Sequence, residues 1–316
     1  MLKTAANGKV IDMAPAAIAK AENTSHSEVN LSGFHLAGIV PVAGQPLDFN
    51  MPWHDCLMPI GQDYLAVERA VLECAYAGCE TIWVVCNDDM QPLIRYRLGE
   101  YMNDPVWTHR HFEHDKKAQQ KRISIHYVPI HPRDRKKRDC LGWSVLYGAW
   151  TANRISSGLS TWLKPSRFYV AFPYGVYDHW APRDYRREIS TNKQFFFSYN
   201  GKTIIDGEYL GFTFDFEDYK KLASEVKVKS TGIYKDEERK EKLSMDERFS
   251  YRFFKLEEIF DTLTLSGSNV KKLPYYYRID SWESYCKYVS EKGAECKGIP
   301  RSVLTYKEWN EIGFDD

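Results

Sequence analysis

The sequence predicts an α/β protein: a layered, mostly parallel sheet flanked by helices, with an antiparallel β portion in the second half. Two patterns indicate this class. In the first half, short apolar runs of strand length alternate with longer segments of helical spacing, as in parallel sheets. In the second half, short apolar segments follow one another around Asn200-Gly201, a typical hairpin turn. With 316 residues, 43% of them hydrophobic, the chain can bury a large core.

The expected elements of the first half begin after Phe34. Short apolar runs favour four buried strands, at His35–Val42, Thr81–Cys86, Ile123–Ile130 and Phe168–Phe172. Helical spacing predicts three helices between them, at Tyr64–Ala77, Gln91–Met102 and Gly142–Ile155. Ligands of such sheets bind outside the carboxyl ends of the strands, so we expect a site in the loops after these strands.

The second half has shorter elements. Three short antiparallel strands are expected at Phe195–Tyr199, Lys202–Ile205 and Leu210–Phe214. The mixed charges of Lys227–Ser250 indicate an exposed helix or loop, and a helix, a strand and a helix are expected at Phe254–Leu263, Leu273–Ile279 and Trp282–Val289. The chain then divides into a partly ordered lead-in over 1–33, an α/β domain over 34–290 and a C-terminal extension over 291–316.

Composition excludes several classes of protein. Lys and Arg together number 43, and Asp and Glu together also number 43. This neutral balance argues against a protein that coats bulk nucleic acid. No apolar run approaches the roughly 20 residues that span a bilayer, so we expect no membrane association. The seven cysteines are scattered, with no CxxC pair, which is typical of small buried side chains in a reducing compartment. A cytoplasmic location is the corresponding expectation.

Several motifs, taken in order, resemble those of the sugar-1-phosphate nucleotidyltransferases, the nucleotide-diphospho-sugar pyrophosphorylases. The resemblance runs discontinuously from about Phe34 to Tyr288. The matching segments are Pro41-Val42-Ala43-Gly44, Leu57-Met58-Pro59-Ile60-Gly61, Ala77-Gly78-Cys79, Cys140–Val145 and Tyr276–Tyr285. It implies a nucleotide-diphospho-sugar transferase-like fold and the conversion of an NTP and a sugar 1-phosphate to a nucleotide sugar and pyrophosphate, with Mg²⁺. A nucleotide-sugar-dependent glycosyltransferase is a variant within the same fold class.

The resemblance also implies a set of site residues. Ala43 and Gly44 would bring their backbone close to the nucleotide, and Asn87 and Asp88 would contact the base or ribose. Gly142, at the start of its helix, would lie near the base or sugar. Asp178 and Asp280 would be the catalytic residues that hold Mg²⁺, which offsets phosphate charge.

The chain departs from the family pattern at the catalytic positions. Gln45–Asn50 replaces a Gly/Arg-rich loop and contains no cation, and Asp55 stands where the family has its catalytic lysine. The first metal aspartate aligns near Tyr174, with Asp178 the nearest carboxylate. The second aligns with Arg278, and Asp280 follows two residues later, on the same strand face but about 7 Å further along. The alternative function is therefore a catalytically degenerate member of the fold that acts in binding or assembly, with a protein partner.

A basic segment offers substitute cations. His109–Arg138 contains ten Lys or Arg and three Asp or Glu. Within it, Arg133 and Lys136 precede the Gly142 helix, whose N-terminus favours phosphate, so both are candidate phosphate contacts. The alternative is a solvated basic turn.

Three other segments allow a functional and a structural interpretation. Asp88 or Asp89 is as well explained by capping of the next helix as by contact with a base. The aromatic turn Pro173–Trp180 could stack on a base or sugar, with Asp178 and His179 as acid/base groups, or it could be a packed loop. His109–His114 has the residue types of a metal site but not the spacing of a standard zinc motif, which favours a polar surface.

Overall fold

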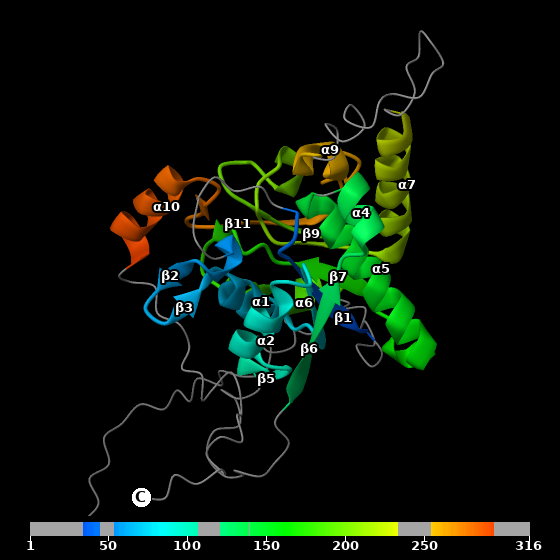
Figure 1. Ribbon diagram of the computed structural model, residues 1–316, viewed down its shortest axis with the longest axis horizontal. Coiled ribbons are helices and arrows are strands. Elements are labelled where there is room, and N and C mark those ends of the chain that lie inside the picture. The colour runs from blue at the N-terminus through cyan, green and yellow to red at the C-terminus, as the bar shows by residue number, and fades with distance from the viewer. Residues whose placement is uncertain (1–33, 45–53, 107–120, 139, 233–253, 294–316) are drawn as a thin grey trace, which may run out of the picture. The chain divides into compact units, whose positions relative to one another are not determined.

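The computed structural model describes residues 34–44, 54–106, 121–138, 140–232 and 254–293. Their centre is an eight-stranded sheet with the strand order β11-β9-β10-β7-β1-β4-β6-β5. The strands are β1 (Leu36–Pro41), β4 (Thr81–Cys86), β5 (Tyr101–Asn103), β6 (Arg122–Pro129), β7 (Arg167–Val170), β9 (Phe195–Ser198), β10 (Phe212–Phe214) and β11 (Asn269–Lys272). Figure 1 shows this sheet with helices around it.

The pairing confirms the predicted fold class. β1 pairs in parallel with β4 and β7, and β4 pairs in parallel with β6, which gives the parallel centre. β10 runs antiparallel to both β7 and β9, which is the expected antiparallel portion of the second half. β1 is buried over its whole length, because apolar side chains on both faces are covered by helices.

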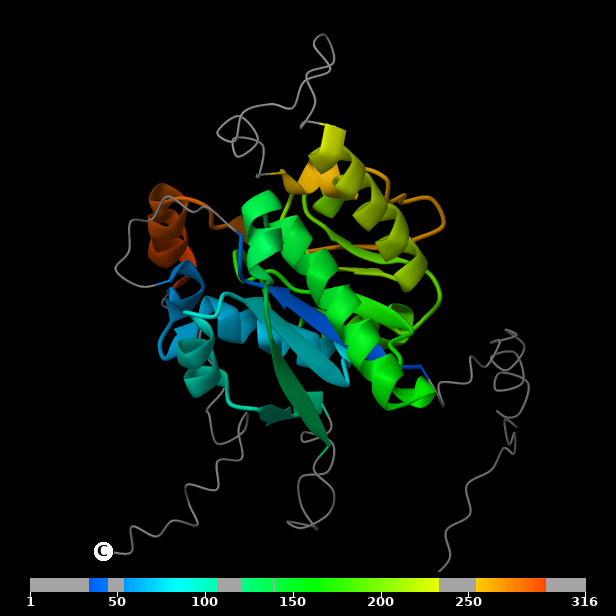
Figure 2. The ribbon, with the colours of Figure 1, turned by 45° about the vertical axis from the view of Figure 1, so that its right-hand side comes forward.

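Helices cover both faces of this sheet. The helices of the described residues are α1 (Ala66–Ala77), α2 (Gln91–Leu98), α4 (Pro132–Lys137), α5 (Leu141–Leu159), α6 (Arg186–Ile189), α7 (Phe216–Gly232), α9 (Leu256–Phe260) and α10 (Trp282–Tyr288). Gly38 of β1 packs against Cys74 of α1, whereas its neighbour Ile39 packs against Gly148 of α5. Successive strand residues point to opposite faces, so α1 and α5 lie on opposite faces of the sheet. α7 lies beside α5 (Figure 2).

Two small ribbons complete the fold. β2 (Pro59–Gly61) pairs with β3 (Tyr64–Leu65), directly before α1. β8 (Gly175–Val176) pairs antiparallel with β12 (Tyr277–Arg278), and this ribbon extends from the carboxyl end of β7. The second ribbon matters for function because it delivers residues of the C-terminal part to the carboxyl edge of the parallel strands.

Three sequence expectations are wrong in detail. α2 ends at Leu98, because Gly99 adopts a φ of 80°, and the chain continues into the edge strand β5 instead of remaining helical to Met102. Lys202–Ile205 is not a strand: Thr203 and Asp206 form a capping box around the 3₁₀ turn Ile204–Asp206. No single strand spans Leu273–Ile279: β11 ends before this range, and β12 (Tyr277–Arg278) covers only two of its residues. The basic segment after β6 forms the short helix α4.

Some expectations fall where the structure describes nothing. These are the lead-in over 1–33, Gln45–Asn50, His109–His114 and 294–316, together with all of Lys227–Ser250 beyond the last turn of α7. Across the described residues, none of the helices has the length and apolar character needed to cross a bilayer.

Candidate functional site

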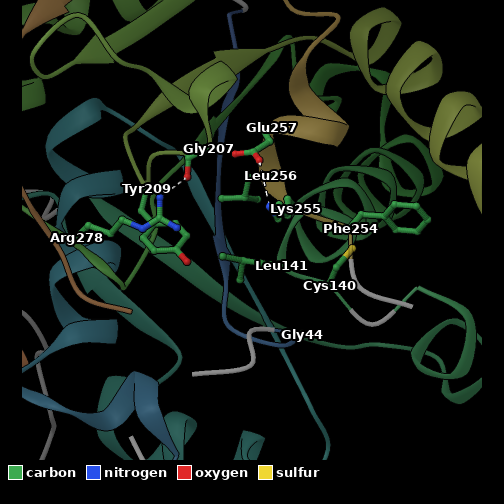
Figure 3. Close-up of a pocket in the computed structure, with 10 residues that line it drawn as sticks. All are labelled: Gly44, Cys140, Leu141, Gly207, Tyr209, Phe254, Lys255, Leu256, Glu257 and Arg278. Carbon is green, nitrogen blue, oxygen red and sulfur yellow. Dashed lines mark hydrogen bonds and ion pairs between the residues drawn. The ribbon is translucent and has the colours of Figure 1, made fainter. Parts of the chain in front are cut away.

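A cavity of about 290 Å³ lies at the carboxyl edge of the parallel strands. It is formed by residues from five segments of the chain: Gly44, Cys140, Leu141, Gly207, Tyr209, Phe254, Lys255, Leu256, Glu257 and Arg278. In Figure 3, Arg278 and Tyr209 approach it from one side and Cys140 from the other, with Glu257 above and Gly44 below. This is the edge where the sequence predicts a ligand.

The floor of the cavity depends on a glycine. Gly44 follows β1 with a φ of +82°, and a Cβ built on it would lie 2.7 Å from the carbonyl carbon of Cys140. The β1 loop therefore touches the backbone at the start of α5. Ser144 strengthens this contact, since its buried hydroxyl donates a hydrogen bond of 2.5 Å to the carbonyl oxygen of Ala43. Ala43 itself is fully buried.

The N-terminus of α5 forms one wall. Leu141 lines the cavity, and the next residue, Gly142, packs against α9: a Cβ on Gly142 would lie 2.5 Å from Cδ1 of Ile259. The start of a helix presents backbone N–H groups and a positive dipole end, both of which favour an anion. The structure thus puts Gly44 and the start of α5 together. Of the residues that the resemblance assigns to the nucleotide here, Gly44 lines the cavity and Ala43 and Gly142 do not.

Arg278 supplies the opposite wall. Its Nε donates a hydrogen bond of 2.6 Å to Oδ2 of Asp280, and its Nη1 donates one of 3.2 Å to the carbonyl oxygen of Gly207. The guanidinium carbon lies 4.8 Å from the centre of the Tyr209 ring. Burial acts to lower the pKa of Arg278, but Tyr209 and Asp280 outweigh it and the pKa is raised. The group therefore remains a fixed cation.

The ribbon can bring Arg278 here because Gly175 lies opposite it. The register pairs Gly175 with Arg278, and a Cβ on Gly175 would lie 1.9 Å from the carbonyl oxygen of Tyr209. Any side chain at this position would push the ribbon away from Tyr209. The close approach holds the guanidinium over the Tyr209 ring.

α9 covers the cavity with two charged residues. Lys255 precedes the helix and Glu257 lies in its first turn, with 3.7 Å between Nζ of Lys255 and Oε1 of Glu257. Lys255 is largely exposed, so this pair is weak and both groups stay accessible to a ligand.

The structure does not bring Asp178 and Asp280 together. Asp178 follows β8 and Asp280 follows β12, and because the two strands are antiparallel the carboxylates leave the ribbon at opposite ends. Asp178 accepts a hydrogen bond of 2.5 Å from the hydroxyl of Tyr275, and Asp280 is paired with Arg278. Neither carboxylate lines the cavity. Within the described parts of the chain, no group of three or more His, Cys, Asp or Glu side chains could hold a metal ion. These carboxylates therefore do not fit one shared Mg²⁺ ion.

The two positions that the resemblance assigns to a metal aspartate and to a lysine also have a different chemistry. Tyr174 is fully buried, and its hydroxyl donates to the carbonyl oxygen of Val42 over 3.4 Å. Asp55 begins a 3₁₀ turn, where burial raises its pKa. A buried tyrosine thus stands at the position of the metal aspartate, and a carboxylate stands at the position of the lysine.

Asn87 and Asp88 follow β4 but do not line the cavity. Oδ1 of Asn87 is buried and has no hydrogen-bond partner among the described residues, while Oδ2 of Asp88 lies 3.3 Å from Nη2 of Arg135. The N-cap of α2 is Met90, with no side-chain cap hydrogen bond, so the capping interpretation of Asp88 or Asp89 is wrong.

The predicted phosphate contacts lie on α4. Arg133 is exposed there and does not line the cavity, and Lys136 is described only by its place in the helix. Their neighbour Arg138 pairs with Asp134 and stacks on Trp143. The cations that do line the cavity, Arg278 and Lys255, were not expected as ligands, although Arg278 stood at the aligned position of a metal aspartate.

Comparison with known proteins agrees with the fold. No protein-family model and no curated protein sequence matches the chain. A putative glucose-1-phosphate thymidylyltransferase from Bacillus anthracis, solved with a sucrose, has a TM-score of 0.51 at 11% identity, over 84% of this chain and 98% of that one. A UTP-bound UGPase from Acinetobacter baumannii has a TM-score of 0.50 at 12% identity, over 88% and 98%. The fold of this chain is that of the nucleotide-diphospho-sugar transferases.

Proposed function

We propose that the chain binds a nucleotide or a nucleotide sugar, with its phosphates in the cavity between Gly44, Leu141 and Arg278. One observation carries the proposal: a glycine loop, a helix start and a guanidinium meet at the carboxyl edge of a parallel sheet. Each of these features suits a phosphate, because backbone N–H groups, the helix dipole and an arginine fork all stabilise its oxygens. The UTP-bound neighbour of the same fold supports this choice of ligand.

The size of the cavity limits what it holds. A volume of about 290 Å³ lies just below the range for ligand sites, roughly 300–1,000 Å³. It therefore accommodates part of a nucleotide, and the phosphates are the part that the charged lining suits.

Nucleotidyl transfer is the second candidate, favoured by the likeness to a thymidylyltransferase and a UGPase. In this reaction a sugar 1-phosphate attacks the α-phosphorus of an NTP and pyrophosphate leaves. Three substitutions argue against nucleotidyl transfer. Asp55 replaces the lysine, and Tyr174 and Arg278 replace the two aspartates, that the resemblance assigns to catalysis. We therefore rank ligand binding without transfer above catalysis.

Calorimetric titration with UTP, dTTP, UDP-glucose and dTDP-glucose tests the proposal. We expect at least one to bind, and a ligand at 100 times its Kd should stabilise the fold by about 2.7 kcal/mol, which a thermal shift detects. Incubation of the same NTPs with glucose 1-phosphate should release no pyrophosphate. Release of pyrophosphate would establish transfer instead.

Two surface variants localise the binding. Lys255→Glu reverses a charge on the cavity lining and should weaken binding, and Lys220→Glu makes the same change on α7, away from the cavity. Equal affinities for the two variants would place the ligand elsewhere. If none of these ligands binds the wild type, the nucleotide proposal is refuted and an assembly role on the same fold takes its place.

A further inference from the structure

A guanidinium stands where the resemblance places a metal-binding carboxylate. Arg278 aligns with the family's second metal aspartate, and in the structure it lines the cavity proposed for the phosphates. The position thus carries a positive charge in place of the negative charge that would attract Mg²⁺. A carboxylate suits a metal ion, whereas a guanidinium suits phosphate oxygens directly.

The surroundings of Arg278 keep the guanidinium in place and leave part of it available. Its Nε and Nη1 are held by Asp280 and Gly207, and Nη1 also lies 3.6 Å from Oε2 of Glu208. Among the described residues, no hydrogen bond involves Nη2. Asp280 and Glu208 do not line the cavity, so the two carboxylates fix the guanidinium without forming the surface that a ligand meets.

The lining itself favours an anion. Its ionised side chains are Arg278, Lys255 and Glu257, which sum to one positive charge, and the N-terminus of α5 adds the positive end of its dipole. Glu208 is further balanced by Lys202, with 3.8 Å between Nζ and Oε1. A divalent cation would meet two cations and one carboxylate here, which is an unfavourable set of ligands for Mg²⁺.

We propose that Arg278 takes over the charge-neutralising role of Mg²⁺, so that the chain binds the diphosphate of a nucleotide without a divalent ion. Two N–H···O contacts from one guanidinium, one from Nη2 and one from the second hydrogen of Nη1, would match two phosphate oxygens. This inference rests on the proposed function, since it concerns how the same cavity holds the same ligand.

The test compares one titration under two conditions. Wild-type protein is titrated with UDP, dTDP and inorganic pyrophosphate, first with EDTA and then with excess Mg²⁺. We expect the same Kd in both, within about twofold, or weaker binding with Mg²⁺, because the ion competes for the phosphates. Binding that requires Mg²⁺ would overturn this inference and leave the proposed function intact. No binding in either condition would refute both.

Variants assign the effect to the guanidinium. Arg278→Gln should raise Kd by about tenfold or more in EDTA, and Arg278→Lys, which keeps the charge but not the fork, should lie between it and the wild type. Arg154→Gln removes one charge from the exposed face of α5, outside the cavity, and is the matched control. An unfolding measurement without ligand checks that each variant folds. If Arg278→Gln does not fold, Arg278→Gln/Asp280→Asn takes its place, because the double variant also removes the carboxylate that the single change leaves unpaired. An unchanged Kd in folded Arg278→Gln would overturn the inference.

Discussion

Gly44 lies against the backbone of Cys140 so closely that a Cβ on Gly44 would meet the nitrogen, carbon and oxygen of Cys140 within 2.7–2.8 Å. The two residues belong to different elements, the loop after β1 and the start of α5, and their contact shapes the cavity floor. Backbone atoms cannot turn aside as a flexible side chain can. The cavity thus exists in this form because position 44 has no side chain.

Gly44→Ala should therefore destabilise the protein. Its φ of +82° is unfavourable for alanine, and the added methyl group would separate the loop from α5. We expect a loss of about 2 kcal/mol or more in the free energy of unfolding, measured by urea denaturation. Gly158→Ala is the matched control, because Gly158 lies in α5 and a methyl group added there would meet nothing within 4 Å, and it should stabilise by about 0.5–1 kcal/mol. Equal effects of the two changes would show that the contact is not tight.

A buried ion pair carries the second prediction. Nη2 of Arg69 lies 2.9 Å from Oε2 of Glu73, and both side chains are almost fully buried. Glu73 also accepts hydrogen bonds from the hydroxyls of Tyr169 and Tyr177. Arg69 donates to the carbonyl oxygen of Phe172 over 2.7 Å, so the pair ties α1 to the end of β7.

Glu73→Leu leaves the Arg69 guanidinium buried without its partner, and should cost about 3–5 kcal/mol of unfolding free energy. Arg69→Met/Glu73→Leu removes both charges and should cost less than the sum of the single changes. A double-mutant cycle from urea denaturation measures the difference. The exposed pair Glu217–Lys220 serves as reference and should give a coupling below about 1 kcal/mol. Additive losses at Arg69 and Glu73 would mean that the ion pair adds no net coupling.

The sequence predicts the parallel centre of this fold well, and the reason is physical. Strands covered on both faces need unbroken apolar runs, and Thr81–Cys86 is such a run in both the prediction and the structure. The edge strand β11 alternates half-buried and exposed residues and contains two lysines, so no apolar run marks it. The start of α7 did leave a signal: Asp215 accepts hydrogen bonds from the backbone N–H groups of Glu217 and Asp218, a cap that the prediction missed.

The site was harder to predict than the fold. The sequence motifs located Gly44 and the start of α5, because Gly44 directly follows a predicted strand and the other motif begins a predicted helix. Arg278 and Lys255 reach the cavity from separate late segments, and only the β8–β12 pairing and the position of α9 bring them there. The motif put Arg278 at the aligned position of a metal aspartate, and the prediction chose Asp280 as the ligand instead. The contacts of Arg278 with Asp280, Gly207 and Tyr209 appear only in the three-dimensional fold.

Accessibility divides the cysteines and gives the third prediction. Cys286 is exposed on α10, whereas Cys56, Cys74, Cys79, Cys86 and Cys140 are buried. Burial also raises the pKa of Cys56 and Cys74 far above the ordinary thiol value and that of Cys86 to about 12, which keeps these thiols protonated and unreactive. Iodoacetamide should thus alkylate Cys286 in the native protein, and Cys56, Cys74 and Cys86 only after unfolding in urea, as peptide mass spectrometry measures. Native alkylation of Cys74 at the rate of Cys286 would contradict the packing of α1.

The last prediction concerns stability at low pH. His179 is buried, and its Nδ1 lies 2.9 Å from the hydroxyl oxygen of Tyr64. Burial, helped by the positive charge of Arg69, lowers the pKa of His179 to about 3. An unfolded chain has an ordinary histidine pKa of about 6.5. Between these two values the unfolded state binds a proton that the folded state does not.

The stability that His179 contributes is therefore complete above about pH 6.5 and is lost as the pH falls toward 3, by about 1.4 kcal/mol per pH unit. His179→Gln should remove this part of the slope while leaving a group that can bond to Tyr64. Urea denaturation at pH 7.5, 6, 5 and 4 compares the two slopes, with the exposed His131→Gln as control. Other carboxylates and histidines titrate in both proteins alike, so they cancel in the difference. A parallel decline of wild type and His179→Gln would show that His179 takes up its proton in the folded state, and that the Tyr64 contact opens to water.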